Sequence, residues 1–195
     1  MGPKYEFTDE TMTFKGHLLH RIRRLPDEQL GGWIESEDNL SQEGKCWVAD
    51  NAMVFGNAQV YGDAKVHDYA EVYDNAKVYG KAKIWDSAQI YNNAEVIGCA
   101  FILDDAQIYG SACIYGNAHV GDHAKIYDNA IISDDAQVFD FARVYDNAKV
   151  YGRAAIYRCA QVYGNAEVCD NAKIHGYTKV QDTRVCVNTE LNDNE

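Results

Sequence analysis

Two histidines, His119 and His123, have the spacing in this sequence that could most readily do chemistry. They lie four residues apart in the stretch AHVGDHA, with Gly121 between them. A neutral imidazole can act as a general base if it lies within hydrogen-bonding reach of a substrate. The glycine is expected to leave a notch beside the two rings. The pair is therefore the candidate catalytic site, and the alternative is two solvated or interface histidines.

An internal repeat of six residues positions these histidines. It runs without insertion or deletion through 23 consecutive hexads, from the one that begins at Val48 to the one that begins at Val180. The first position of every hexad is Val or Ile, and the fifth is Ala in all but the last two. A period of six suits a short strand followed by a corner, with these two positions pointing inward. Gly, Asp and Asn at the third and fourth positions are residues typical of turns.

These hexads, such as VYDNAK and VYGKAK, resemble the hexapeptide-repeat superfamily in their aliphatic and small positions. The resemblance implies an all-β fold, a three-sided left-handed parallel β-helix (solenoid) with three strands in each coil. The repeat then makes seven to eight coils, in a prism on the order of 35 Å long. Residues 1–33 are predicted to form a capping segment with a β-hairpin around TDET. Residues 34–47 would form an imperfect first coil, 48–185 the β-helix, and 186–195 a frayed acidic tail.

Residues 18 apart should lie one above another, so the three outer faces can be considered separately. We call them first, second and third, from the strands at Val48, Val54 and Val60. The second face is predicted to carry an aromatic ladder above Phe55, made of Tyr73, Tyr91, Tyr109, Tyr127, Tyr145 and Tyr163. Stacked rings would reinforce the prism. A flat surface for binding or self-association is the alternative interpretation.

The first face is irregular, and it gathers the large apolar side chains. These form a predicted interface made of Trp85, Phe101, Leu103, Phe139, Phe141 and Tyr157. An exposed apolar patch of this size normally has a cover or a partner. We expect the cover to be either residues 1–33 folded back over the face, or another subunit or partner protein.

Charged residues mark two further features. One corner of the first face carries a predicted acidic edge, formed by Asp50, Asp68, Asp86, Asp104, Asp122 and Asp140. Backbone hydrogen bonds at the turns would explain these carboxylates, and a ridge for cations or a basic protein is the alternative. The basic segment KGHLLHRIRR carries Lys15, Arg21, Arg23 and Arg24. We expect it to dock on the acidic prism, and the alternative is an anionic ligand or nucleic acid.

Composition limits the function classes. A net charge of −12 over 195 residues argues against direct binding of nucleic acid or of an anionic membrane. No apolar run is long enough to span a membrane, and the start does not resemble a signal peptide. The sequence has no phosphate-binding glycine loop and no Cys/His spacing for a metal. Its six cysteines, which follow no pattern, favour a reducing cytoplasm.

We therefore predict a cytoplasmic, non-catalytic binding or scaffold protein that needs no metal or other cofactor. It would act through a protein partner, as a homo-oligomer (dimer or trimer), or both. The regular repeat resembles uncharacterised hexapeptide proteins of bacteria and phages, which implies a phage-borne inhibitor of a host protein as one role. Many superfamily members are acyltransferases with a histidine base and a bound acyl-CoA. Acyl transfer by His119 or His123 is thus the main alternative, and acidic mimicry of nucleic acid is another.

Overall fold

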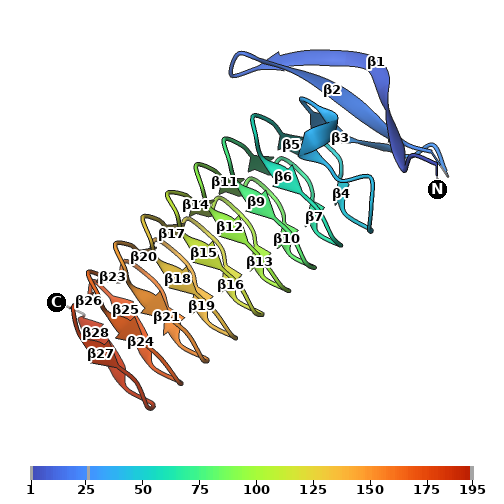
Figure 1. Ribbon diagram of the computed structural model, residues 1–195. Helices are drawn as coiled ribbons and strands as arrows, with labels where there is room; N and C mark the ends of the chain where they lie inside the picture. The colour runs from blue at the N-terminus through green and yellow to red at the C-terminus, as the bar shows by residue number, and fades with distance from the viewer. Residues whose placement is uncertain (1, 26, 194–195) are drawn as a thin grey trace.

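Short parallel strands stack into three sheets in the computed structural model, which describes residues 2–25 and 27–193 (Figure 1). Each sheet of the repeat collects every third strand along the chain. Residues 18 apart are paired, as Lys83 is with Phe101 and Ile84 with Ile102. The predicted three-sided β-helix of parallel coils is therefore confirmed.

The three sheets are the three faces of the prism. The first face consists of β4 (Trp47–Val48), β7 (Lys65–Val66), β10 (Lys83–Ile84), β13 (Phe101–Ile102), β16 (His119–Val120), β19 (Gln137–Val138), β22 (Ala155–Ile156), β25 (Lys173–Gly176) and β28 (Glu190–Asp193). The second face consists of β1 (Tyr5–Phe14), β2 (His17–Arg24), β3 (Leu30–Ile34), β5 (Met53–Val54), β8 (Glu71–Val72), β11 (Gln89–Ile90), β14 (Gln107–Ile108), β17 (Lys125–Ile126), β20 (Arg143–Val144), β23 (Gln161–Tyr163) and β26 (Lys179–Gln181). The third face consists of β6 (Gln59–Val60), β9 (Lys77–Val78), β12 (Glu95–Val96), β15 (Cys113–Ile114), β18 (Ile131–Ile132), β21 (Lys149–Val150), β24 (Glu167–Val168) and β27 (Arg184–Val185).

The core is a continuous column of Val, Ile and Ala side chains inside the prism. Both inward positions of the hexad are fully buried, as Ile102 and Ala106 illustrate. Burying one large aliphatic side chain contributes roughly 1.5–3 kcal/mol. The small Ala lets the chain turn at each corner without crowding the aliphatic residues of the three strands.

The corners turn on residues with positive φ at the third position of the hexad. Gly98 has a φ of 73°, and a Cβ there would lie 3.0 Å from the carbonyl oxygen of Gly116 in the next coil. Asp and Asn fill many other corners, because short polar side chains tolerate the left-handed region better than most residues. Asp86, for example, has a φ of 57°.

The N-terminal hairpin differs from the prediction. β1 runs through the stretch TDET, where the pairing register shifts between Phe7 and Thr11. The chain turns instead at Lys15 and Gly16, which have φ values of 48° and 86°. A two-residue hairpin turn needs positive φ at both positions, which glycine allows without strain. β2 pairs with β3 and β3 with β5, so the hairpin extends the second-face sheet (Figure 1).

The first coil is longer than the others. Ile34 pairs with Val54 and Leu40 with Val60, a spacing of 20 residues in place of 18. The 3-10 turn η1 (Glu37–Asn39) occupies one corner of this coil, and the buried Asn39 donates hydrogen bonds to two backbone carbonyls. Within the described residues this turn is the only helical element, and no helix is long and apolar enough to cross a membrane.

The C-terminal end also differs from the prediction, because the tail is not frayed up to Asp193. β28 pairs with β25, so Glu190 lies beside Lys173 and the apolar Leu191 packs on the core. This strand and the long first coil raise the number of coils from the predicted seven or eight to about nine. The last coil has 17 residues in place of 18, as the pairing of Glu167 with Arg184 shows.

Candidate functional site on the first face

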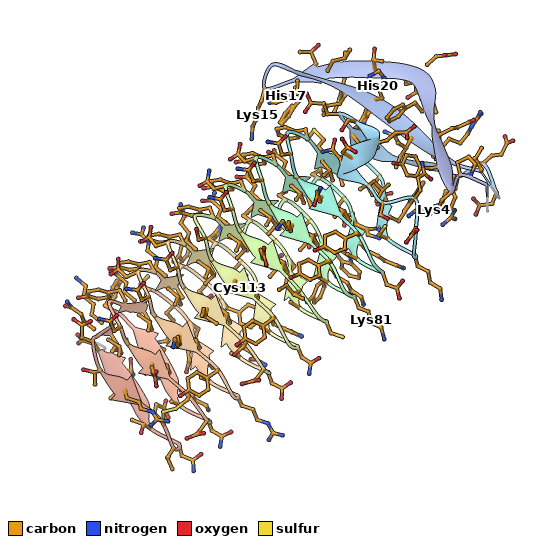
Figure 2. All side chains as sticks on the ribbon, viewed as in Figure 1. Lys4, Lys15, His17, His20, Lys81 and Cys113 are labelled. Atoms are coloured by element: carbon orange, nitrogen blue, oxygen red, sulfur yellow. A yellow bond between two sulfur atoms is a disulfide. The ribbon has the colours of Figure 1, made fainter. Side chains whose placement is uncertain are left out.

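The described chain leaves the middle of the first face uncovered. The β1–β2 hairpin lies against the second face, where the ring of Phe14 meets Phe55 at 5.9 Å. Lys15 at the hairpin tip points onto the same face and pairs with Glu71 at 2.6 Å (Figure 2). The alternative in which residues 1–33 fold back over the apolar residues around Trp85 is therefore wrong. The cap reaches only the N-terminal end of the first face, where Arg24 lies over the ring of Trp47 at 5.4 Å.

Aromatic side chains contact one another along the first face. The rings of Trp85 and Phe101 meet edge to face at 4.8 Å, and Phe101 meets His119 in the same way at 5.8 Å. Leu103 and Phe139 are half-buried, and Phe141 is 59% exposed at the corner. These residues form one surface, which we call the aromatic patch. The remaining interface candidate, Tyr157, stacks on His175 nearer the C-terminal end.

The candidate catalytic histidines are exposed and lie apart from any notch. The ring of Phe139, from the next coil, fills the space beside Gly121, where an added Cβ would lie 3.0 Å from the phenyl carbons. The notch expected there is therefore absent. His123 lies 3.4 Å from the Asp105 carboxylate and stacks on Phe141, while His119 meets Phe101. The geometry supplies a nearby acid for His123, and Phe139 occupies the space in which a substrate was expected.

The aromatic ladder of the second face is regular. From Phe55 to Tyr163 successive rings stack with centroids 4.9–5.1 Å apart and planes within 7° of parallel. Burial raises the pKa of Tyr73 and of Tyr127 to about 12. Asparagine side chains beside the ladder are also bonded in a row, as Asn57 donates to Asn75 at 3.0 Å. The ladder is thus a set of mutually satisfied contacts.

The acidic edge forms a ladder of backbone hydrogen bonds. Each carboxylate accepts the backbone N–H of the residue 18 positions later, as Asp104 does from Asp122 at 3.0 Å. The series begins at Asp50 and ends where Arg158 donates to Asp140 at 2.8 Å. Turn chemistry therefore accounts for aspartate at these corners, and it also fixes a row of negative charge beside the aromatic patch.

The basic segment docks on the acidic prism, as expected, through only one of its four cations. Lys15 reaches the prism at Glu71 on the second face. Arg23 pairs with Glu6 in the neighbouring strand, and Arg24 binds Asp27 at 2.8 Å in its own turn. Arg21 lies over the ring of Trp33 at 5.0 Å. Three of the four cations thus stabilise the N-terminal cap itself.

Two of the cysteines are paired, although their sequence spacing gave no sign of it. Cys169 and Cys186 form a disulfide, with Cα atoms 4.6 Å apart. The expectation of six unpatterned thiols is therefore wrong, because the 17-residue last coil brings these two into register. Asp170 lies within 4.8 Å of both sulfur atoms, but sulfurs joined in a disulfide cannot bind a metal as thiolates.

The sequence analysis did not predict a hollow that the structure shows at the N-terminal end of the first face. It is lined by Trp47, Ala49, Lys65 and His67 from the first two coils, and by Arg24 from the hairpin. A signal for it exists, since a small Ala49 follows the large Trp47 at outward positions. The contacts from the cap, which come from chain distant in sequence, could not be anticipated.

The uninterrupted 18-residue coils define a three-sided parallel β-solenoid. This fold, together with one partial sequence similarity, fits the hexapeptide-repeat superfamily. The chain is similar to an uncharacterized acetyltransferase, YdcK, of Escherichia coli (strain K12), with 35% identity. The match covers 32% of this chain and spans only 24% of the relative's length. No protein-family model matches the chain.

Proposed function

We propose that this protein is a non-catalytic binding protein whose first face docks a protein partner with a basic surface. The observation that carries the proposal is the aromatic patch, which the described chain leaves uncovered around Trp85 and Phe101. Aromatic side chains are enriched in the buried centres of protein interfaces, where they contribute most of the binding free energy. The narrower role of a phage-borne inhibitor of a host protein is included, because such an inhibitor acts by contact alone.

The acidic edge supports a basic partner in preference to a second copy. Asp86, Asp104 and Asp122 follow the outward residues of the patch along one rim. The whole chain has a net charge of −12, so two copies facing each other would bring like charges together. A partner with Lys or Arg around an apolar centre would complement both features.

Affinity capture with matched variants tests this proposal. Wild type, the double variant W85E/F101E and the control Y115E are used as baits in a lysate of the source cells. Tyr115 is an exposed ring on the third face, so its replacement makes the same chemical change away from the patch. We expect basic proteins captured by wild type and Y115E, and lost with W85E/F101E. Equal capture by all three baits would contradict the proposal.

The same variants, with their mass in solution measured as well, separate two other outcomes. A doubled mass in solution for wild type but not for W85E/F101E would show that a second copy occupies the face. Capture of a nucleic-acid-binding protein that DNA displaces would indicate acidic mimicry of nucleic acid, since the aspartates stand at regular intervals.

Acyl transfer is a second candidate function, because the partial relative bears the name of an acetyltransferase. In this chain the base would be His119 or His123, and the acyl donor would be an acyl-CoA. His123 with Asp105 at 3.4 Å has the acid that could orient an imidazole. Titration with acetyl-CoA in a calorimeter tests this candidate. Binding that is lost in both H119A and H123A would favour the enzyme over the binding protein.

A further inference from the structure

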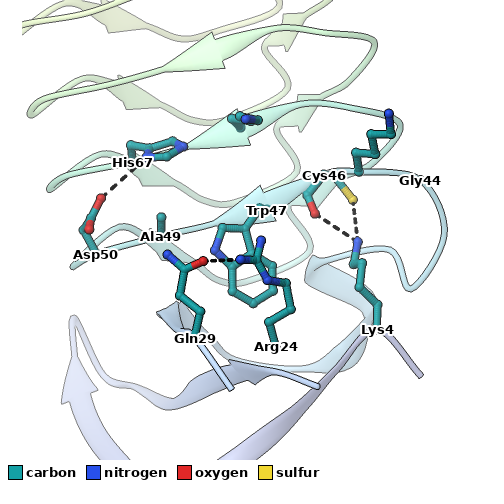
Figure 3. Close-up of a pocket in the computed structure, with 11 residues that line it drawn as sticks. Lys4, Arg24, Gln29, Gly44, Cys46, Trp47, Ala49, Asp50 and His67 are labelled. Carbon is teal, nitrogen blue, oxygen red and sulfur yellow. Dashed lines mark hydrogen bonds and ion pairs between the residues drawn. The ribbon is translucent and has the colours of Figure 1, made fainter. Parts of the chain in front are cut away.

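The hollow at the N-terminal end of the first face has the size of a small-molecule site (Figure 3). Its volume is about 570 Å³, within the roughly 300–1,000 Å³ typical of ligand pockets. Ala49 forms part of its floor, and Trp47, His67 and Arg24 surround it. The pocket exists because Ala49 leaves room beside the rings of Trp47 and His67, and Arg24 and Gln29 close one side.

Two ring nitrogens in this pocket have no hydrogen-bond partner within the described protein. Trp47 is only 6% exposed, and its Nε1 is buried without an acceptor. The buried Nε2 of His67 also has no partner, while its Nδ1 lies 3.5 Å from Asp50. Buried polar atoms are nearly always bonded, because leaving one unpaired costs about 1–3 kcal/mol. An indole nitrogen can only donate, so it calls for an acceptor from outside the chain.

Positive charge gathers around the same pocket. Its lining includes only one carboxylate, that of Asp50. The four cationic side chains of the lining are Lys4, Arg24, Lys45 and Lys65. This is the reverse of the whole chain, which carries 30 acidic and 18 basic residues.

The four cations differ in how far they are committed to the protein. Lys4 donates to the Ser41 and Cys46 carbonyls at 2.6 and 3.0 Å, and Arg24 binds Asp27. Lys65 is exposed beside Trp47 on the paired strands β4 and β7. Lys65 is therefore the cation best placed to contact a ligand together with the indole.

We infer that this pocket binds a small ligand through an oxyanion, a phosphate or carboxylate group. The indole N–H of Trp47 donates to one ligand oxygen, and the ammonium of Lys65 supplies a charge-assisted hydrogen bond. His67 in the tautomer with its proton on Nε2 provides a further donor. Arg24, 5.4 Å from the centre of the Trp47 ring, adds long-range attraction for the anion.

Calorimetric titration of the full chain tests this inference, with inorganic pyrophosphate and citrate as probes and sodium chloride of equal ionic strength as the blank. K65Q removes the free charge, and W47F keeps an aromatic ring but removes the N–H donor. K173Q is the matched control, because Lys173 is an exposed residue in the same column near the other end of the face. We expect about tenfold weaker binding in K65Q and in W47F, and an unchanged affinity in K173Q.

Binding of pyrophosphate alone would assign the pocket to phosphates, and binding of citrate alone would assign it to carboxylates. The inference fails if neither anion binds wild type at millimolar concentration, or if K173Q weakens binding as much as K65Q. The thermal midpoint of each variant reports whether it is folded. Should W47F be unfolded, A49L fills the pocket from its floor and must abolish binding.

Discussion

The first and second faces of this prism stand on the same core but differ in their outer side chains. On the second face, rings from Phe55 to Tyr163 stack in parallel, and asparagines beside them are bonded in a row. On the first face, Trp85 and Phe101 meet edge to face, and Phe141 is 59% exposed. Where the repeat is regular, the outer side chains contact equivalent side chains in the neighbouring coils. Where it is irregular, outer side chains stay exposed and can contact a partner.

This difference separates structural from functional residues in a repeat protein. A residue that recurs every 18 positions has a copy of itself as its neighbour, which suffices to explain it. A residue that breaks the column, such as Trp85 or Gly121, needs another explanation. The first face holds most of these departures, and it also holds the pocket beside Trp47.

The largest expected effect concerns the core beneath both faces. Ile102 and Ile108 are fully buried under the first and second face respectively. We expect I102A and I108A each to lower the free energy of unfolding by about 2–5 kcal/mol, because each leaves a cavity. Urea denaturation measures both. Costs that differ by more than about 2 kcal/mol would mean that the two faces do not share an equivalent core.

The next effect contrasts the outer rings. Tyr109 stacks on two neighbours, so Y109A should lower the free energy of unfolding by about 1–3 kcal/mol. Phe141 is mostly exposed, so F141A should change the free energy of unfolding by less than about 0.5 kcal/mol. Thermal and urea unfolding report the two values. A larger cost for F141A would show that the aromatic patch stabilises the fold instead of serving a partner.

A third effect tests whether the acidic edge differs from other corners. Asp104 and Asp128 both have positive φ, 58° and 56°, and each accepts a backbone N–H from the next coil. D104A and D128A should each cost about 1–2 kcal/mol, from backbone strain and the lost acceptor. D104N, which retains an acceptor and tolerates this φ, should cost less. A gain in stability for D104A would contradict turn chemistry and indicate charge repulsion along the edge.

The smallest effect is a loss of stability at high pH from the ladder. The folded pKa of Tyr127 is raised to about 12, above the ordinary value near 10. Between pH 10 and 12 the unfolded chain therefore loses this proton first, so stability present below pH 10 declines as pH rises. Urea unfolding at pH 9 and 11 measures the decline. Y127F should reduce it, and an unchanged decline would assign it to other groups.

Periodicity predicted which side chains point inward, since Val or Ile recurs every six residues. The resemblance to the hexapeptide-repeat superfamily supplied the three strands in each coil. The hairpin turn was misplaced, because the acidic stretch TDET resembles a turn, whereas Lys15 and Gly16 supply the required backbone angles. The C-terminal coil was misjudged because one missing residue hides Leu191 and Cys186 from a strict period of six.

The functional surface was less accessible to sequence analysis. The column assignments brought Trp85 and Phe101 together, but they could not show where the hairpin packs. They also placed a notch at Gly121, which the ring of Phe139 fills from the neighbouring coil. The pocket beside Trp47 includes Arg24 from the cap. The repeat pattern does not predict this contact, because it joins residues from two different parts of the fold.

Site-specific photocrosslinking is the most direct test that the first face docks a partner. A photoreactive phenylalanine derivative replaces Phe141 in one variant and Tyr115, the exposed ring of the third face, in another. After irradiation in a lysate of the source cells, we predict a covalent adduct to a basic protein from position 141 and none from position 115. Adducts of equal yield from both positions, or none from position 141, would contradict the account.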